Sequence, residues 1–167
     1  KVNNYLKLDT PYNGETSVYH YLEILRDKIG FDKIKEAVKV PLTGKKIGAY
    51  YGCLLLRPGK VLQFDDPENP QIMEDLIRAL GAEPVIYNMR NECCGGYTIL
   101  EDLNSAEKNT TSILENAEDM GADFLITACP LCQYNLLQNS LSEKTPIYYF
   151  TELLAYALGL KERECFK

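Results

Sequence analysis

Residues 123–132 read Asp-Phe-Leu-Ile-Thr-Ala-Cys-Pro-Leu-Cys. The stretch 123–128 is short and mostly apolar, which is typical of a buried strand. It ends at Cys129, and the stretch from Pro130 to Asn139 follows as a predicted helix that starts at this cysteine. A buried strand that passes directly into a helix is the unit from which parallel sheets are built.

The same alternation of strand and helix runs through most of the chain. Strands are predicted over residues 45–53, 84–87, 123–128 and 146–150. Helices are predicted over residues 16–30, with Thr16 or Ser17 as the cap, and over 31–38, 71–80, 104–120, 130–139 and 151–158. Residues 1–14 and 57–70 are expected to be irregular. This order requires crossover connections, so we predict an α/β fold with a mostly parallel open sheet and helices on both faces.

Length and composition limit what the protein can be. The chain has 167 residues, 46% hydrophobic and 25% charged, which suits one globular domain, residues 1–167, with a helical lead-in over about 1–42. No apolar run reaches the roughly 18 residues of a membrane span. The net charge is −6 without a block of Lys and Arg, which argues against nucleic-acid binding. No signal peptide is recognisable, so we expect a cytoplasmic location, or one peripheral to a membrane through partner subunits.

Five of the six cysteines follow predicted strands. The carboxyl ends of parallel strands meet at one edge of a sheet, and functional loops gather there. We therefore expect these five thiols to share one site. They are Cys53 after the first strand, Cys93 and Cys94 after the second, and Cys129 and Cys132 after the third.

A shared site of this kind has four chemical interpretations, which the residues alone leave open. A disulfide pair fits poorly with five thiols, two of them adjacent. A zinc site usually needs four ligands, often from CxxC pairs, and only Cys129 and Cys132 form such a pair. A thioredoxin-like centre would use Cys129 at a helix start, where a thiol pKa falls, and would leave three thiols unused. An iron–sulfur cluster binds through thiolates, and the turn 93–96 offers backbone N–H groups to its sulfides. Five thiols exceed the four that a cubane cluster needs.

The cysteine pattern resembles that of the CCG domain, the cysteine-rich domain of the heterodisulfide reductase B subunit. Between Cys53 and Cys93 lie 39 residues, the turn reads Cys93-Cys94-Gly95-Gly96, and 34 residues separate Cys94 from Cys129 of the CxxC pair. The resemblance spans roughly residues 16–140. It includes Val18-Tyr19-His20, Tyr50-Tyr51-Gly52-Cys53, Leu56-Arg57-Pro58, Phe64 to Pro70 and Gly121-Ala122-Asp123.

The resemblance implies a cofactor, a reaction and partners. Such subunits contain two CCG domains, each with a noncubane [4Fe–4S] cluster, and a disulfide between the clusters is cleaved by electrons delivered one at a time. In methanogens the substrate is the heterodisulfide of coenzyme M and coenzyme B. Only one complete motif is present, so the chain looks like the carboxyl-terminal half of such a subunit, with the other subunits of the complex as partners. The implied ligands are Cys53, Cys93, Cys94, Cys129 and Cys132.

One departure from the family lies directly after the first cysteine. The family often carries His directly after the first cysteine, where this chain has Leu54. This puts a proton-donating role at that position in doubt.

Two functions other than disulfide reduction remain open. One is an electron-transfer module of another quinone- or thiol-linked oxidoreductase complex, and the other is a zinc-stabilised domain with no redox role.

Four further features have simpler interpretations. His20, the only histidine, is expected to be structural or exposed, and Cys165 in the charged tail to be a spare surface thiol. Arg57 suits either a charge contact near the site or a surface ion pair. The acidic loop 65–68 is expected to be a turn and a possible partner contact, because carboxylates are poor ligands for iron–sulfur clusters. The tyrosines at strand ends are expected to cover the core or the site.

Overall fold

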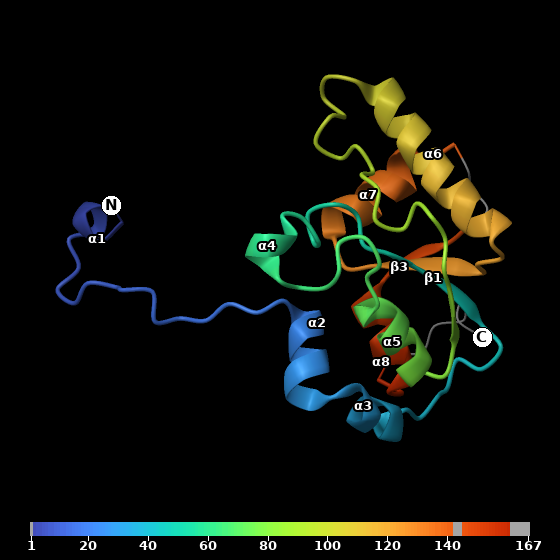
Figure 1. Ribbon diagram of the computed structural model, residues 1–167, viewed down its shortest axis with the longest axis horizontal. Helices are drawn as coiled ribbons and strands as arrows, with labels where there is room; N and C mark the ends of the chain where they lie inside the picture. The colour runs from blue at the N-terminus through green and yellow to red at the C-terminus, as the bar shows by residue number, and fades with distance from the viewer. Residues whose placement is uncertain (1, 142–144, 161–167) are drawn as a thin grey trace.

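The computed structural model describes residues 2–141 and 145–160, so Cys165 lies outside the described residues. Its four strands form one sheet in the order β2-β1-β3-β4, and all neighbouring strands are parallel (Figure 1). The strands are β1 (Lys46–Tyr50), β2 (Glu83–Val85), β3 (Phe124–Thr127) and β4 (Ile147–Tyr149). The predicted α/β fold with a parallel sheet is confirmed.

The central pair of strands is buried on both faces. Every residue of β3 is buried, as is every residue of β1 after Lys46. This double burial explains why both strands appear in the sequence as nearly continuous apolar runs. Ile47 pairs with Phe124 and Tyr50 with Thr127, so the two strands end level with each other.

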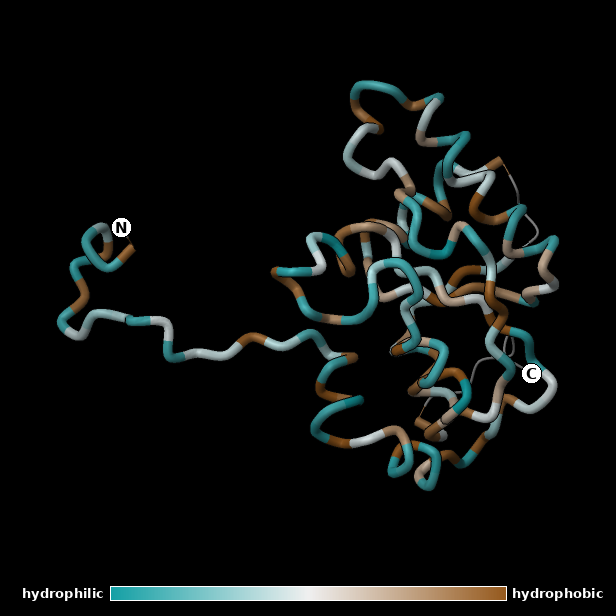
Figure 2. The backbone as a smooth tube through the Cα atoms, in the orientation of Figure 1, coloured by the Kyte–Doolittle hydropathy of each residue, from teal (hydrophilic) through white to brown (hydrophobic). Residues whose placement is uncertain are grey.

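Helices cover both faces of the sheet, as predicted. The first face carries α2 (Tyr21–Glu23) with its π-helical continuation η1 (Ile24–Ile29), α3 (Phe31–Ala37), α5 (Ile72–Ala79) and α8 (Phe150–Ala157). The second carries α6 (Leu103–Asp119) and α7 (Pro130–Asn139). In Figure 2 the covering helices alternate between hydrophobic and hydrophilic residues.

Alternate residues of the central strands supply the two cores. Ile47, Phe124 and Ile126 belong to the core beneath α5 and α8. Tyr50 and Leu125 belong to the core beneath α6 and α7. The two-residue period of a strand therefore divides its apolar side chains between both faces.

The structure differs from the sequence prediction in the short helices. Residues 1–14 and 57–70 were expected to be irregular, yet they contain α1 (Val2–Leu6) and α4 (Gly59–Leu62). Each is about one turn long, and such a turn leaves little periodic signal in a sequence. The residues before α2 extend away from the sheet (Figure 1).

The prediction that Thr16 or Ser17 caps the first long helix is wrong. His20 is the cap: its Nδ1 accepts a hydrogen bond from the Leu22 N–H (3.2 Å). The His20 N–H in turn donates to the Glu23 carboxylate (2.7 Å). This reciprocal capping box satisfies backbone donors at the helix start, and it places the helix start four residues later than Thr16.

The contact between β1 and β3 predicts the effect of one small substitution. A Cβ at Gly48 would overlap the side chain of Leu125 and lie 3.2 Å from the Tyr87 ring. We expect Gly48→Ala to lower the free energy of unfolding by about 1–3 kcal/mol, because the buried neighbours must shift. Urea unfolding of the two proteins measures this difference.

Leu125→Ala provides the control. Alone it should destabilise by about 2–5 kcal/mol through the cavity that it leaves. In the Gly48→Ala background it also removes the overlapping atom, so the double variant should lose less stability than the sum of the single variants. Strict additivity would contradict the close contact.

Candidate functional site

The loops that follow β1, β2 and β3 surround one pocket. It has a volume of about 350 Å³, including space open to solvent. The structure brings all five predicted cysteines to this pocket, as the topology of a parallel sheet led us to expect. Its lining residues are Tyr51, Cys53, Leu54, Leu55, Cys93, Cys94, Gly96, Tyr97, Cys129, Leu131 and Cys132.

The five thiols differ in their exposure. All five are free cysteines. Cys94 and Cys132 are buried, Cys53 and Cys129 are half-buried, and Cys93 is exposed. The pocket therefore has a buried floor and an open rim, and thiols are present on both.

Gly52 permits the first cysteine loop to approach the third. Its φ of +66° is a left-handed conformation that favours glycine. A Cβ at this position would lie 2.9 Å from Sγ of Cys132. A side chain here would therefore push against a thiol of the site, which gives a physical reason for glycine directly before Cys53.

Hydrogen bonds from both neighbouring elements hold the second cysteine loop. The amide of Asn135, on α7, donates to the Cys94 carbonyl (2.6 Å), and the Tyr50 hydroxyl at the end of β1 donates to the Glu92 carbonyl (2.8 Å). Within the loop, the N–H of Gly95 donates to Sγ of Cys93 (3.3 Å). Gly95 itself has a φ of +78°, and this conformation lets the turn direct a backbone N–H toward sulfur.

The third loop places two thiols at the start of α7. Cys129 is the N-cap, and its Sγ accepts a hydrogen bond from the Cys132 N–H (3.3 Å). Pro130 follows as the first helical residue, where no backbone N–H is needed. The helix start stabilises negative charge on Cys129.

Thiol pKa values diverge strongly within the pocket. Hydrogen bonding from Cys132 lowers the pKa of Cys94 to about 5 and that of Cys129 to about 6. The same two contacts, together with burial, raise the pKa of Cys132 far above its ordinary value. Burial and contact with Cys93 raise the pKa of Cys53 to about 11. Without a metal, two thiolates therefore flank one protonated thiol at neutral pH.

The donor set fits an iron–sulfur cluster on chemical grounds. Thiolates are the protein ligands that such clusters use. Among the described residues that line the pocket, none carries a carboxylate, an imidazole or a basic side chain. As the side chains are placed, however, no group of three or more Cys, His, Asp or Glu residues within 2–141 and 145–160 could hold a metal ion.

His20 and Arg57 do not line the pocket, and both make contacts elsewhere. His20 is half-buried against the rings of Phe64 and Phe150 (centroids 5.3 and 6.2 Å away), and burial lowers its pKa. Arg57 forms an ion pair with exposed Glu68 (3.1 Å) and donates to the Asn91 carbonyl (3.1 Å). His20 therefore has the structural role that we expected, and Arg57 joins two loops.

Sequence reasoning missed a buried polar group next to the site. Glu74 is fully buried, and its carboxylate contacts Tyr51 and Arg90. A signal was available, because Glu74 lies between Met73 and Leu76 on a helix whose other buried residues are apolar. A carboxylate in that position needs a partner.

Comparison with known proteins identifies the cysteine pattern. The family model of the CCG "Cysteine-rich domain" matches residues 47–137. The chain is 33% identical over 173 residues (98% of this chain, 60% of the relative) to the 8-methylmenaquinol:fumarate reductase membrane anchor subunit of Wolinella succinogenes. It is 30% identical over 166 residues (92% and 54%) to the B subunit of the ferredoxin/F420H2-dependent CoB–CoM heterodisulfide reductase of Methanosarcina acetivorans.

A third relative extends the comparison. A protein of Archaeoglobus profundus, named as similar to the B subunit of heterodisulfide reductase, is 29% identical over 172 residues, 95% of this chain and 58% of the relative. The chain thus spans between half and three fifths of the length of these relatives. In the part of the chain that the structure describes, no helix is long and apolar enough to cross a membrane.

The thiol pKa values predict an order of reactivity in the reduced, metal-free protein. Alkylation of Cys129 by iodoacetamide should be half-maximal near pH 6, because its pKa is about 6 and the thiolate is the nucleophile. Alkylation of Cys53 should continue to rise well above neutral pH, because its pKa is about 11. Mass spectrometry of peptides labelled over a pH series measures both profiles.

Cys132→Ala is the matched variant. It removes the hydrogen bond that contributes most to lowering the pKa of Cys129, so the labelling profile of Cys129 should move to higher pH. A wild-type Cys129 profile at the ordinary thiol pKa of about 8.5 would contradict the geometry of this loop.

Proposed function

The chain belongs to the CCG family of cysteine-rich domains, and from this premise we propose that it is an iron–sulfur redox subunit. Its cofactor would be a noncubane [4Fe–4S] cluster held by Cys53, Cys93, Cys94, Cys129 and Cys132. The observation that supports this is the convergence of five free thiols from three loops on one pocket. A cluster of this kind accepts and donates single electrons.

The remaining features of the pocket serve the cluster in distinct ways. Cys94 and Cys129 are thiolates at neutral pH, since their pKa values lie at about 5 and 6. The turn with Gly95 directs an N–H toward sulfur. Leu54, Leu55 and Leu131 line the pocket beside the thiols and limit the access of water.

The reaction that we propose is reductive cleavage of a disulfide within a larger complex. The chain is similar over most of its length to subunits named for CoB–CoM heterodisulfide reduction. Cleavage takes two electrons and two protons and yields two thiols. The chain carries one complete cysteine motif and spans about half of these relatives, so the second cluster and the electron donor would come from the rest of the subunit and from partner subunits.

A second candidate, electron transfer with a quinol, is favoured by a specific observation. Leu54 lines the pocket at the position where the resembling family often carries His. Leu55, Tyr97 and Leu131 make the rest of the wall apolar or aromatic. A relative named for 8-methylmenaquinol:fumarate reduction is 33% identical over 98% of this chain. An apolar wall without a histidine suits the ring of a quinone.

Metal loading tests the proposed cofactor. Anaerobic reconstitution with ferrous iron and sulfide should give a brown protein with about four irons per chain. Cys94→Ser should reduce the bound iron strongly, because a buried hydroxyl replaces a thiolate. Cys165→Ser should load iron as the wild type does, and iron analysis with electron paramagnetic resonance distinguishes the variants. A colourless wild type that binds only zinc would support the zinc-stabilised domain instead.

Exposure to air should reverse this loading. Closely spaced thiols that lack a cluster oxidise readily, so protein prepared in air should lack iron and contain a disulfide between Cys129 and Cys132 or a neighbouring pair. Mass mapping of the disulfides under non-reducing conditions checks this. An intact cluster after long aerobic handling, or five free thiols in an oxidised preparation, would contradict it.

The reconstituted chain alone should show cluster redox chemistry and negligible disulfide reductase activity. Disulfide cleavage takes two electrons, and one cluster supplies one at a time. The assay uses a low-potential viologen dye as donor with the heterodisulfide, and then with a short-chain menaquinone, to separate the two candidate functions. Multiple turnovers of disulfide by the isolated chain would show that one cluster suffices.

A further inference from the structure

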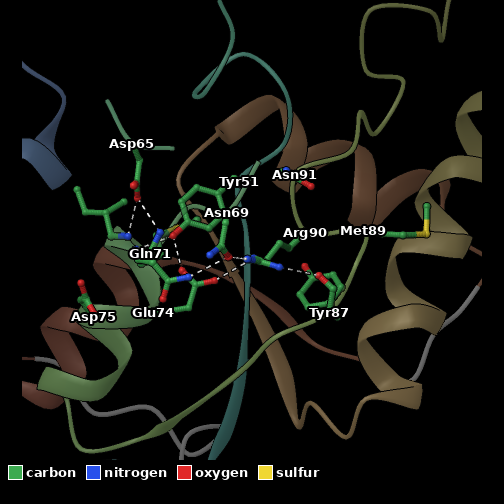
Figure 3. A network of polar contacts seen from close by, with 12 residues as sticks. Tyr51, Asp65, Asn69, Gln71, Glu74, Asp75, Tyr87, Met89, Arg90 and Asn91 are labelled. Atoms are coloured by element: carbon green, nitrogen blue, oxygen red, sulfur yellow. Dashed lines mark hydrogen bonds and ion pairs between the residues drawn. The ribbon is translucent and has the colours of Figure 1, made fainter. Parts of the chain in front are cut away.

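Within residues 2–141 and 145–160, three buried polar atoms beside the cysteine loops have no hydrogen-bond partner. They are Oε1 of Glu74, Nε of Arg90 and the hydroxyl of Tyr87. Glu74 has no exposed side-chain surface, and the side chain of Arg90 is 8% exposed. Buried charges without full hydrogen bonding are costly. Figure 3 shows these residues together, between α5 and the strand ends.

The charge of Glu74 is only partly compensated. Nε of Arg90 lies 3.3 Å from Oε1 of Glu74, but the two atoms form no hydrogen bond. The other guanidinium nitrogens of Arg90 donate elsewhere, to the Tyr87 carbonyl (3.3 Å) and to Oδ1 of Asn69 (2.6 Å). Arg90 and Glu74 therefore do not form the usual bidentate pair, in which two guanidinium N–H groups donate to one carboxylate.

Tyr51 joins the same carboxylate to the start of the first cysteine loop. The Tyr51 hydroxyl donates to Oε2 of Glu74 and accepts from the Met73 N–H (2.9 Å). The Tyr51 N–H donates to the Arg90 carbonyl (2.8 Å). Tyr51 also lines the pocket two residues before Cys53. One side chain thus separates Glu74 from the pocket.

Four titratable or charged groups act on Glu74 from the surrounding elements. They are Tyr51 at the end of β1, Tyr87 after β2, Arg90 in the loop beyond it and Asp65 before α5. Burial raises the pKa of Glu74, and the negative charge of Asp65 raises it further. The hydrogen bond from Tyr51 and the charge of Arg90 lower it. The charged groups on the side toward α3, namely Asp32, Lys35, Asp75 and Arg78, line a separate surface hollow.

We propose that Glu74 is a proton-accepting group linked to electron uptake at the cysteine pocket. For each electron that a one-electron donor delivers to the pocket, the Glu74 carboxylate takes one proton from solvent, and it returns the proton when the electron leaves. The physical reason is that added negative charge in a low-dielectric surrounding disfavours a nearby buried carboxylate. The inference rests on the proposed cluster, and it concerns a residue outside the ligand set.

The pH dependence of the reduction potential tests this link. In the reconstituted wild-type chain, the midpoint potential should fall as pH rises through the range between the pKa values of Glu74 in the oxidised and reduced states. Glu74→Gln keeps the size of the side chain and removes the titration, so its potential should not change over that range. Asp75→Asn alters the next residue, an exposed carboxylate of the same helix, and should retain the wild-type slope. An equal slope in wild type and Glu74→Gln would overturn the proposal.

Infrared difference spectroscopy gives a readout that does not depend on whether Glu74→Gln folds. Reduction of the wild-type protein by dithionite should produce the carbonyl band of a protonated, buried carboxylic acid, and Asp75→Asn should produce the same band. Absence of the band in wild type would overturn the proposal even if Glu74→Gln failed to fold. A wild-type chain that takes up no iron would instead overturn the proposed cofactor, and this inference with it, so the two failures are distinguishable.

Discussion

The parallel pairing of β1 with β3 is the constraint on which the site depends. Because Tyr50 pairs with Thr127, the two strands end level with each other, and Cys53 and Cys129 follow those ends by three and two residues. The loops must then pass close together, which Gly52 allows because it has no Cβ to meet Sγ of Cys132. A shift of the register would move the two loops apart and leave the thiols on separate surfaces.

The pKa values of the thiols in the pocket depend on one another. Cys94 and Cys129 have lowered pKa values chiefly because Cys132 donates hydrogen bonds to both. The pKa of Cys132 is raised in return, so the metal-free pocket cannot ionise all of its thiols at neutral pH. A metal supplies the positive charge that makes several adjacent thiolates compatible. The cluster that we propose would supply this charge, since its protein ligands are thiolates.

The sequence predicted the parts of the fold that depend on patterns longer than one turn. The apolar run of 123–128 and the helix from Pro130 were found where expected, and parallel topology then placed the five cysteines together. The cap of α2 was missed because Thr and Ser are more usual cap residues than His. In the structure the Glu23 carboxylate accepts a hydrogen bond from the His20 N–H, which favours His20 as the cap. The short helices α1 and α4 were missed because one turn carries no period. Glu74 was missed because its partners, Tyr51 and Arg90, are distant in sequence.

Both candidate reactions consume protons together with electrons. A disulfide becomes two thiols by taking two electrons and two protons, and a quinone becomes a quinol by the same count. The described residues that line the pocket offer cysteine and tyrosine as their titratable side chains, and Leu54 is the residue directly after Cys53. Glu74 lies one side chain away from the pocket, to which Tyr51 joins it. A buried carboxyl in this place would let the chain gain an electron without gaining net charge, which lowers the electrostatic cost of reduction whichever acceptor follows.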